Sequence, residues 1–282
     1  MRIIVTGSSG RIGWSVYHNL IKAGHEVLGV DIQLPRSDVR NSLRVDLTQS
    51  GEIYGALGQF KAEAVVHMGA WANPGHVPDQ DTYRDNTTGT FNLFQACADL
   101  GIQRIVSASS AQVYGFRDYA PEYVRVDESH PLHPLNCYAE SKIAGESAAD
   151  YFGNKYDMSI ASFRFMGVRI PSEIDNEIGR IQEDPSSGKW LMWTRTDARD
   201  AAEACRLAVE VDKLETGPYN ITGSQSVLER DIRDLIAEYY GSDVEIRESQ
   251  DESLSPLSCD RARQAFGYEP KRVWTESNRY PL

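Results

Sequence analysis

The sequence predicts an α/β fold: a doubly wound parallel sheet followed by a small C-terminal lobe. Residues 3–5 form a short β-branched run, which suits a strand buried on both faces. Gly7, Gly10 and Gly13 follow at intervals of three and lead into an apolar-periodic helix over residues 12–23. Strand and helix patterns then alternate up to about residue 165, which is typical of parallel sheets covered by helices.

Composition narrows the class of protein. A chain of 282 residues that is 41% hydrophobic and 25% charged can bury one substantial core with a smaller lobe attached. No apolar run approaches the roughly 18 to 20 residues of a membrane span, and the N-terminus reads as a strand rather than a signal peptide, so we expect a cytoplasmic protein. The formal charge of -12 disfavours nucleic-acid and anionic-membrane partners. The four widely spaced cysteines indicate neither a disulfide framework nor a metal site.

The glycine turn indicates a dinucleotide site. At this spacing Gly7 permits a tight turn, Gly10 lets the backbone approach a pyrophosphate, and Gly13 lets the new helix pack closely on the strand. The N-terminus of that helix directs free N–H groups at the phosphates. Residues 25–30 read as the next strand, which completes the strand, turn, helix and strand order that a glycine triplet alone does not establish.

Asp31 ends this second strand, about twenty residues beyond the glycines. A carboxylate there accepts hydrogen bonds from the ribose hydroxyls and repels a 2′-phosphate, which favours NAD over NADP. The alternative is an ordinary strand–helix–strand unit with a solvated acid at the strand end. Arg36 could instead accept a 2′-phosphate, so NADP stays open as a second alternative.

Further elements bring small and polar residues toward the same edge of the sheet. A short strand over residues 43–45 precedes Asp46, which we expect to cap the adenine edge unless it is a surface-loop acid. A helix over 50–60 and a buried strand over 64–67 follow. After His67, Gly69 and Ala70 are small enough for a dinucleotide to approach the backbone. His67 itself reads as a hydrogen-bonded core histidine.

The chemistry is predicted where the fifth strand ends. A long amphipathic helix over 79–100 precedes a strand over 102–107 and then serines, including Ser110, at the edge where ligands collect. After a polar loop over 116–136, Tyr138 and Lys142 stand four apart and so share one helix face. On that face the Lys142 ammonium would lower the pKa of the Tyr138 phenol from about 10, so that the phenolate can act as a general base for a carbinol proton. Ser110 would bind the oxygen of the same carbinol, and Lys142 would also bind the nicotinamide ribose. A tyrosine and a lysine four residues apart often arise by chance when no other signal accompanies them.

Together these residues resemble the NAD-dependent epimerase/dehydratase family of extended short-chain dehydrogenases/reductases, over about three fifths of the chain. The matching motifs are Thr6-Gly7-Ser-Ser-Gly10-Arg-Ile-Gly13, Asp31, Asp46-Leu47, His67-Met-Gly-Ala70, Asn86, Ser109-Ser110-Ala-Gln-Val-Tyr-Gly115, Tyr138-x-x-x-Lys142 and Arg164-Phe165. The resemblance implies that Ser110, Tyr138 and Lys142 are the catalytic trio, with Tyr114 packing against the loop. It implies cofactor contacts from Gly7, Gly10, Arg11, Ile12, Gly13, Asp31, Asp46, Leu47, Gly69, Ala70, Asn86, Tyr138 and Lys142.

The second half departs from the nucleotide-sugar epimerases of this family. Met166-Gly167 stand where those enzymes usually carry an asparagine, and only residues 172–192 separate Pro171 from Trp193. This short segment looks more like the compact sugar and uronate dehydrogenases. Beyond it we expect a helix over 197–211, a strand over 218–222, a helix over 226–240, a strand over 244–247, an acidic surface loop over 248–258 and a helix over 260–266.

The sequence therefore predicts an NAD-binding Rossmann domain over 1–165 and a mainly substrate-binding lobe over 166–282, with residues of about 197–222 returning to the first domain. The predicted function is an NAD-dependent oxidation of a carbinol of a sugar or similar small polyol. The alternative is a nucleotide-sugar epimerase or dehydratase resembling a UDP-sugar 4-epimerase, and a third is a non-catalytic NAD sensor. The predicted partners are a sugar-like small molecule and a second copy, with a homodimer formed through the helices at 79–100 and 138–156.

Overall fold

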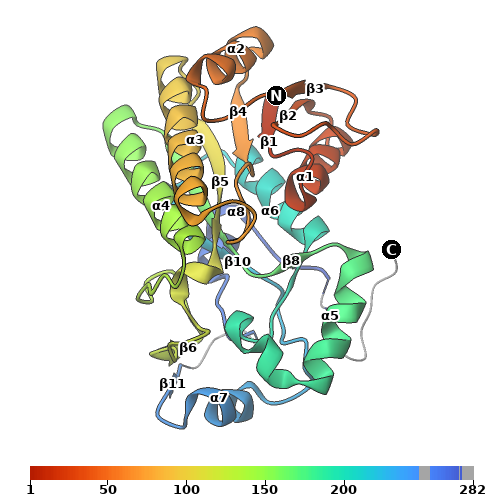
Figure 1. The fold of residues 1–282 in the computed structure, drawn as a ribbon, viewed down its shortest axis with the longest axis vertical. Helices are drawn as coiled ribbons and strands as arrows, with labels where there is room; N and C mark the ends of the chain where they lie inside the picture. The colour runs from red at the N-terminus through yellow and green to blue at the C-terminus, as the bar shows by residue number, and fades with distance from the viewer. Residues whose placement is uncertain (248–254, 273, 275–282) are drawn as a thin grey trace. The chain divides into compact units, whose positions relative to one another are not determined.

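The computed structural model describes residues 1–247, 255–272 and 274. Within these residues the main sheet has seven strands in the order β10-β7-β5-β4-β1-β2-β3 (Figure 1). The pairs of β1 with β2, β1 with β4, β2 with β3 and β4 with β5 are parallel. This crossover order, in which the chain winds outward from β1 in both directions, confirms the predicted doubly wound α/β fold.

The elements of the first half follow the expected alternation. They are β1 (Arg2–Thr6), α1 (Arg11–Lys22), β2 (Glu26–Asp31), β3 (Ser42–Arg44), α2 (Ser50–Phe60), β4 (Ala64–His67), α3 (Asp79–Asp99), β5 (Arg104–Ser110), a 3-10 turn η1 (Ala111–Tyr114), β6 (Tyr123–Val124), α4 (Cys137–Tyr156) and β7 (Ser159–Phe165). The fifth strand is longer than predicted, because the serines expected after it still lie within β5.

The later elements are shorter. They are β8 (Val168–Arg169), α5 (Pro171–Glu183), a 3-10 segment η2 (Pro185–Leu191), β9 (Thr196–Asp197), α6 (Ala198–Glu210), β10 (Gly217–Ile221), α7 (Ile232–Tyr240), β11 (Glu245–Ile246) and α8 (Asp260–Phe266). The helix predicted from residue 226 begins six residues later. The Ser226 side chain there accepts a bond from the Leu228 amide in a turn, and Asp231 caps the helix by accepting from the Arg233 amide. Most of the loop predicted at 248–258 lies outside the described residues.

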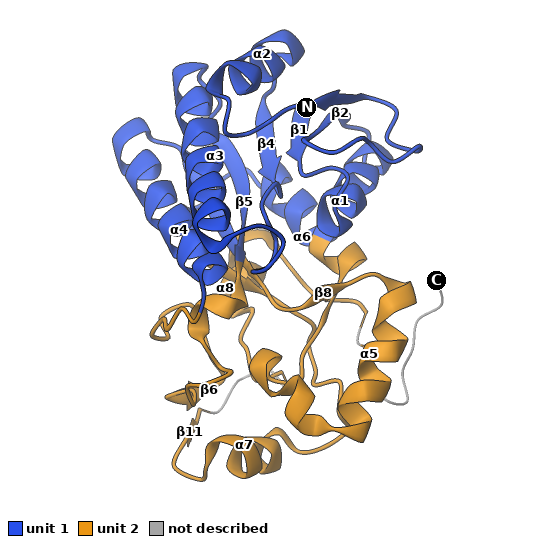
Figure 2. Ribbon diagram, in the orientation of Figure 1, with its two compact units in different colours: residues 1–109, 136–163, 202–218 blue, residues 110–135, 164–201, 219–282 orange. Residues whose placement is uncertain are grey.

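The chain forms two compact units that interleave in sequence (Figure 2). Unit 1 contains residues 1–109, 136–163 and 202–218, and unit 2 contains 110–135, 164–201 and 219–282. Residues 110–135, which we assigned to the cofactor domain, thus belong to unit 2. The predicted division into a cofactor domain up to residue 165 and a substrate lobe after it stays a prediction, because it concerns what each part binds.

The core of unit 1 lies between the sheet and the layer formed by α2, α3 and α4, which Figure 1 shows next to one another in front of β4 and β5. Strand residues such as Ile4, Val65 and Ile105 are buried there against Phe94 of α3 and Phe152 of α4. The Phe94 and Phe152 rings meet edge to face at 5.8 Å. This packing fixes α4 against the sheet, and α4 carries the predicted catalytic pair.

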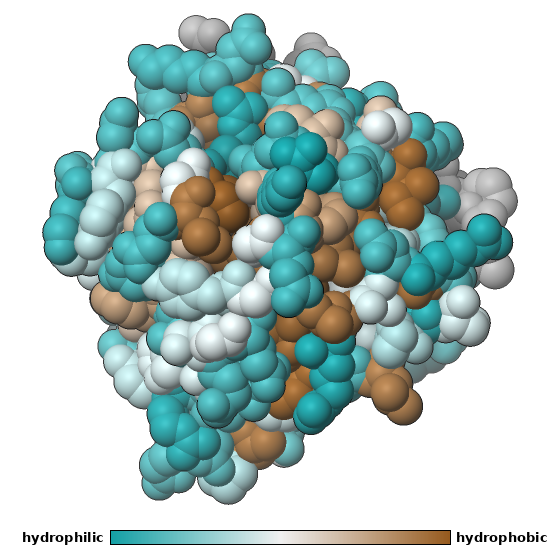
Figure 3. All heavy atoms as spheres, turned by 90° about the horizontal axis from the view of Figure 1, so that it is seen from above, coloured by the Kyte–Doolittle hydropathy of each residue, from teal (hydrophilic) through white to brown (hydrophobic). Residues whose placement is uncertain are grey.

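In unit 2, short parallel pairs join β8 to β9 and β6 to β11. Trp193 is fully buried there, donates from Nε1 to the Pro185 carbonyl at 2.7 Å and packs against Tyr239 and Tyr240. In the face drawn in Figure 3, hydrophilic residues dominate and hydrophobic ones show in patches between them. Among the described residues, no helix is long and apolar enough to cross a membrane.

Candidate active site

The glycine turn after β1 has the predicted geometry. Gly7 has a φ of +65°, and a side chain there would lie 2.7 Å from the backbone of Met68 and Gly69. A Cβ on Gly13 would lie 2.1 Å from the Gly7 carbonyl oxygen, so α1 approaches the turn more closely than any side chain allows. Gly10 caps α1, whose first turn carries no acidic residue. These features fit a pyrophosphate at the helix N-terminus.

Asp31 lies directly beside this turn. Its Oδ2 accepts a hydrogen bond from the Ser9 amide at 2.9 Å, and its Oδ1 accepts one from the Gln33 amide at 3.0 Å. The carboxylate is therefore held at the end of β2, where the predicted ribose contact requires it. Arg36 reaches the same place, because its Nε donates to the Ser9 carbonyl at 3.0 Å and its guanidinium lies 5.2 Å from the Trp14 ring centre.

Asp46 and Leu47 have different structural roles. Oδ1 of Asp46 accepts bonds from the amide and hydroxyl of Thr48, at 2.9 and 2.8 Å, and so caps a local turn. Leu47 packs on the core, and its Cδ1 would lie 2.8 Å from a Cβ on Gly69. Gly69 is thus required by close packing inside the protein, and the adenine contact of Asp46 stays a prediction.

His67 is a core histidine, as its position in the buried strand predicted. Its Nδ1 is 2.8 Å from the Thr6 hydroxyl and its Nε2 is 3.0 Å from the Thr90 hydroxyl. Burial, together with the charge of Lys142, lowers the pKa of His67 to about 3. The ring is therefore neutral near pH 7. The Thr6 hydroxyl also accepts bonds from the Met68 and Gly69 amides, which shapes the loop after β4.

Tyr138 and Lys142 lie in the first turns of α4, as predicted. The helix is capped by Asn136, whose Oδ1 accepts a bond from the Ala139 amide at 2.8 Å. The Lys142 Nζ lies 5.5 Å from the centre of the Tyr138 ring, and both side chains are buried. Lys142 Nζ also donates to the Ala108 carbonyl of β5 at 2.8 Å. Burial lowers the pKa of Lys142 to about 8, against an opposing effect of Glu146.

Asn86 braces the loop after β4 against α4. Its Oδ1 accepts from the Trp71 amide at 2.8 Å, and its Nδ2 donates to the Trp71 carbonyl and to the Ser141 hydroxyl at 3.2 and 3.0 Å. The structure therefore explains Asn86 first as a link between α3 and α4. The cofactor contact expected of it stays a prediction.

Ser110 is the last residue of β5, and its Oγ accepts a bond from the Gln112 amide at 3.2 Å. It belongs to unit 2, whereas Tyr138 and Lys142 belong to unit 1, so the three as one site stay a prediction. The neighbouring Tyr114 is fully buried in unit 2. Its hydroxyl donates to Asn220 at 2.8 Å and accepts from Arg164 at 3.0 Å, which fits the packing role expected of it.

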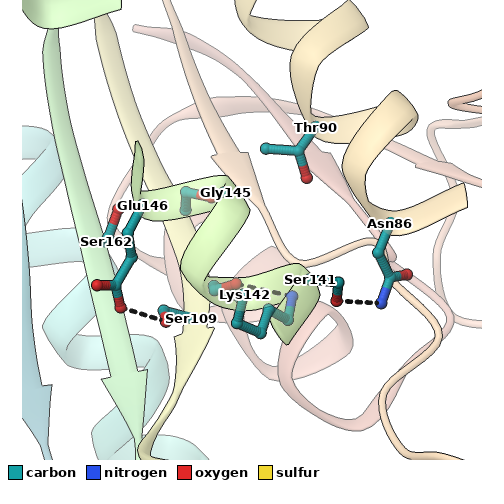
Figure 4. Close-up of a pocket in the computed structure, with 10 residues that line it drawn as sticks. Asn86, Thr90, Ser109, Ser141, Lys142, Gly145, Glu146 and Ser162 are labelled. Atoms are coloured by element: carbon teal, nitrogen blue, oxygen red, sulfur yellow. Dashed lines mark hydrogen bonds between the residues drawn. The ribbon is translucent and has the colours of Figure 1, made fainter. Parts of the chain in front are cut away.

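A small polar cavity, which was not predicted from the sequence, lies beside Lys142 (Figure 4). Its volume is about 10 Å³, and Figure 4 shows Ser109 and Glu146 on one side of Lys142, with Ser141 and Asn86 on the other. The Ser109 hydroxyl donates to a Glu146 carboxylate oxygen at 2.6 Å. The signal in the sequence was the spacing, because Glu146 follows Lys142 by four residues and so shares its helix face.

Unit 2 explains the departures from the epimerase pattern. Met166 is fully buried, and Gly167 has a φ of +50° with Leu191 and Arg195 packed against it. Nearby, Glu177 of α5 is ion-paired with Arg169, Arg180 and the buried Arg195. The side chains that follow β7 are thus used for packing and for one buried charge cluster.

Comparisons with known proteins agree with this geometry. The model of the NAD-dependent epimerase/dehydratase family matches residues 3–222. A UDP-glucose 4-epimerase of Mycolicibacterium smegmatis is 29% identical over 186 residues, which cover 61% of this chain and 58% of that protein. The chain spans between 49% and 58% of the length of this and another curated relative that it matches.

Two solved structures share the fold. A short-chain dehydrogenase/reductase superfamily protein of Agrobacterium tumefaciens with bound NAD has a TM-score of 0.74 at 23% identity, covering 98% of this chain and 93% of that one. The UDP-glucose 4-epimerase of Thermus thermophilus in complex with NAD has a TM-score of 0.70 at 25% identity, covering 97% and 95%. The sequence match, the fold and the NAD bound in both solved structures agree on NAD as the cofactor. The chain belongs to the NAD-dependent epimerase/dehydratase family of extended short-chain dehydrogenases/reductases.

Proposed function

We propose that the chain is a nucleotide-sugar epimerase that oxidises a secondary alcohol of a UDP-linked sugar and reduces the ketone again from its other face. The single observation that carries the chemistry is the pair of Tyr138 and Lys142, buried on one face of α4 beside the end of β5. The relatives named UDP-glucose 4-epimerase support the substrate class. Our sequence prediction preferred a dehydrogenase, and these relatives favour its alternative.

In this proposal the residues of the chain divide the work. Tyr138 removes the proton of the sugar hydroxyl, since the adjacent Lys142 ammonium favours an ionised phenol. Ser110 holds the same oxygen by a hydrogen bond. The backbone of Gly7 to Gly13 and the carboxylate of Asp31 bind the dinucleotide. NAD, when bound, supplies a hydride acceptor that can also return the hydride.

A sugar dehydrogenase is the second candidate, and a specific observation favours it. Between β8 and the buried Trp193 the chain forms only the helix α5 and the short η2, over residues 171–191. The buried Met166 and the glycine after it offer no amide side chain for a diphosphate. A smaller substrate without a nucleotide suits this compact lobe.

One experiment separates the candidates. Purified protein is incubated with NAD and either UDP-glucose, UDP-galactose, UDP-glucuronate or the corresponding free sugars, and both NADH absorbance and the sugar products are measured. We expect a UDP-sugar to be converted into its 4-epimer without accumulation of NADH. Net NADH with a free sugar would establish the dehydrogenase instead, and inertness toward every substrate would contradict both. The Tyr138→Phe protein serves as the control for background reaction.

We also propose that the protein acts as a homodimer through α3 and α4. On these helices Tyr83, Phe91 and Tyr151 leave between 41% and 46% of their surface exposed although they are aromatic. Phe91 and Tyr151 stack on each other across the two helices at 6.4 Å, which makes one apolar surface. A cytoplasmic location remains the expectation from the sequence.

A further inference from the structure

Lys142 is buried, so keeping its ammonium charged costs desolvation free energy, and the neighbouring Tyr138 does not offset this cost. The lysine side chain is only 7% exposed, and it donates a hydrogen bond to a neutral carbonyl, that of Ala108. A buried ammonium is costly unless an opposite charge is near. Yet the proposed chemistry needs Lys142 charged, since a neutral amine would neither favour the phenolate nor bind a ribose as strongly. The counter-charge must therefore come from the surroundings of the lysine.

The cavity beside Lys142 identifies that surrounding charge. Residues of α3, β5, α4 and β7 line it, and its polar side chains include those of Asn86, Ser109 and Ser162. Among the described residues that line it, Glu146 is the acidic one. The other titratable groups facing Lys142 are Tyr138 on its own helix and His67 of β4, and His67 is neutral near pH 7.

Glu146 is also held in place. The Ser109 hydroxyl of β5 donates to its carboxylate at 2.6 Å, so the acid is tied to the residue next to the Ala108 carbonyl that Lys142 binds. Figure 4 shows this arrangement: Lys142 and Glu146, one helical turn apart on α4, are each bonded to the same short stretch of β5. A glutamate free to turn toward water would not offer a fixed charge, whereas this one is anchored.

We propose that Glu146 is a positioning residue that acts on the reaction through Lys142: its carboxylate, fixed by Ser109, is the counter-charge that keeps the lysine ammonium inside the site. The proposal rests on the proposed function only for its effect on turnover. Lys142 and Glu146 both line the cavity, whose volume of about 10 Å³ is at the lower limit for a single water, so there is little room for solvent between the groups that line it. Charges interact strongly there because little solvent screens them.

The test measures the pKa of Lys142 directly, without substrate or cofactor. The chain contains seven lysines, so the side-chain ¹³C NMR spectrum of lysine-labelled protein contains few signals. The signal of Lys142 is the one that disappears in Lys142→Arg. In Glu146→Gln we expect the pKa of Lys142 to fall by about one pH unit or more, the size typical of a lost opposite charge. Ser109→Ala, which frees the carboxylate but keeps its charge, should give a smaller fall, and Glu146→Asp should restore part of the value.

The matched control is Glu140→Gln, which removes the same charge from an exposed position on the same helix. It should leave the pKa of Lys142 unchanged. An unchanged pKa in Glu146→Gln, or an equal fall in Glu140→Gln, would overturn the proposal. If Glu146→Gln does not fold, as judged by circular dichroism, Ser109→Ala and Glu146→Asp decide, and the absence of a fall in Ser109→Ala is then the contrary result.

A kinetic readout distinguishes this proposal from the proposed function. On a substrate that the unmutated enzyme converts, the high-pH limb of the kcat/KM profile should move to lower pH in Glu146→Gln and return toward its place in Glu146→Asp. A merely structural role would lower kcat/KM at every pH without moving the limb. If the unmutated protein converts no sugar but Glu146→Gln still lowers the pKa of Lys142, only the proposed function fails. Turnover with an unmoved limb and an unmoved pKa rejects the role of Glu146 alone.

Discussion

The Nζ of Lys142 donates a hydrogen bond to the carbonyl oxygen of Ala108 at 2.8 Å, which fastens helix α4 to strand β5. The bond explains how a lysine can be buried next to Tyr138 with its ammonium in a fixed direction. It does not remove the cost of that burial, which lowers the pKa of Lys142 from 10.5 to about 8.

This pKa predicts how stability depends on pH. Above 10.5 the lysine is neutral in both the folded and the unfolded chain, and between 10.5 and about 8 the unfolded chain takes up the proton first. The contribution of Lys142 to stability therefore falls by roughly 3 kcal/mol as the pH falls through this range. We expect Lys142→Met to gain stability relative to the unmutated protein as the pH falls from 10.5 to 8. Urea unfolding of both proteins without NAD measures this difference, and a difference independent of pH would contradict it.

Tyr138→Phe isolates the proposed general base. It removes one hydroxyl from a buried ring, so we expect turnover to fall by about a hundredfold or more while NAD binding is retained. Lys142→Ala should weaken NAD binding as well, because a cofactor contact is lost with the charge. Tyr114→Phe is the matched control, since its hydroxyl is bonded to Asn220 and Arg164 within unit 2. Near-normal turnover in Tyr138→Phe would overturn the assignment of the site.

Most of the fold could be predicted because its signals are local. The β-branched run of β1, the glycines and the periodicity of α3 each report a short segment, and together they determine the order of elements. One helix, α5, was not predicted although its buried Ile174, Ile178 and Ile181 follow a helical spacing. The other unpredicted elements lack such periodicity: β6, β8 and β9 have two residues each, and η2 runs from a proline into a left-handed residue, Met192. Such segments are held by contacts far away in the sequence.

In the candidate site, too, local patterns could be predicted and contacts between distant residues could not. The shared helix face of Tyr138 and Lys142 could be predicted from their spacing, and the family resemblance then assigned them to the chemistry. The bond between Ser109 and Glu146 joins residues 37 apart, and the brace from Asn86 to Ser141 joins residues 55 apart. No local pattern reports such pairs. The sequence therefore predicted the residues proposed for the chemistry better than the polar groups that hold them.

Gly13→Ala tests the close approach of α1 to the glycine turn. The added Cβ would lie 2.1 Å from the Gly7 carbonyl oxygen, which is backbone and cannot turn aside. We expect a loss of stability of a few kcal/mol and at least a tenfold loss of NAD affinity, measured by urea unfolding and by calorimetry. Gly55→Ala is the control, because Gly55 lies inside α2 and its added Cβ would meet no atom within 4 Å beyond its chain neighbours and its own helix backbone. There alanine should stabilise the helix by about 0.5 to 1 kcal/mol.

The homodimer predicts the behaviour of the aromatic surface on α3 and α4. Light scattering at micromolar concentration should give the mass of a dimer, and Phe91→Glu with Tyr151→Glu should give a monomer, since two charges cannot be buried unpaired in an interface. Tyr119→Glu, which changes a comparably exposed aromatic residue of unit 2, should leave the dimer intact. A monomer mass for the unmutated protein would contradict the prediction.

Asp31 and Arg36 predict the choice of cofactor, because they act in opposite directions at the same place. Both side chains bond to Ser9, one through its amide and the other through its carbonyl, so they flank the turn proposed to bind the dinucleotide. A 2′-phosphate would be repelled by the carboxylate and attracted by the guanidinium. We expect the unmutated protein to bind NAD more tightly than NADP, because the Asp31 carboxylate is fixed by two backbone amides. Asp31→Ala should narrow that preference, whereas Arg36→Ala should widen it by weakening NADP alone. Equal affinities of the unmutated protein for the two cofactors, measured by calorimetry, would contradict the role of Asp31, and an unchanged NADP affinity in Arg36→Ala would contradict that of Arg36.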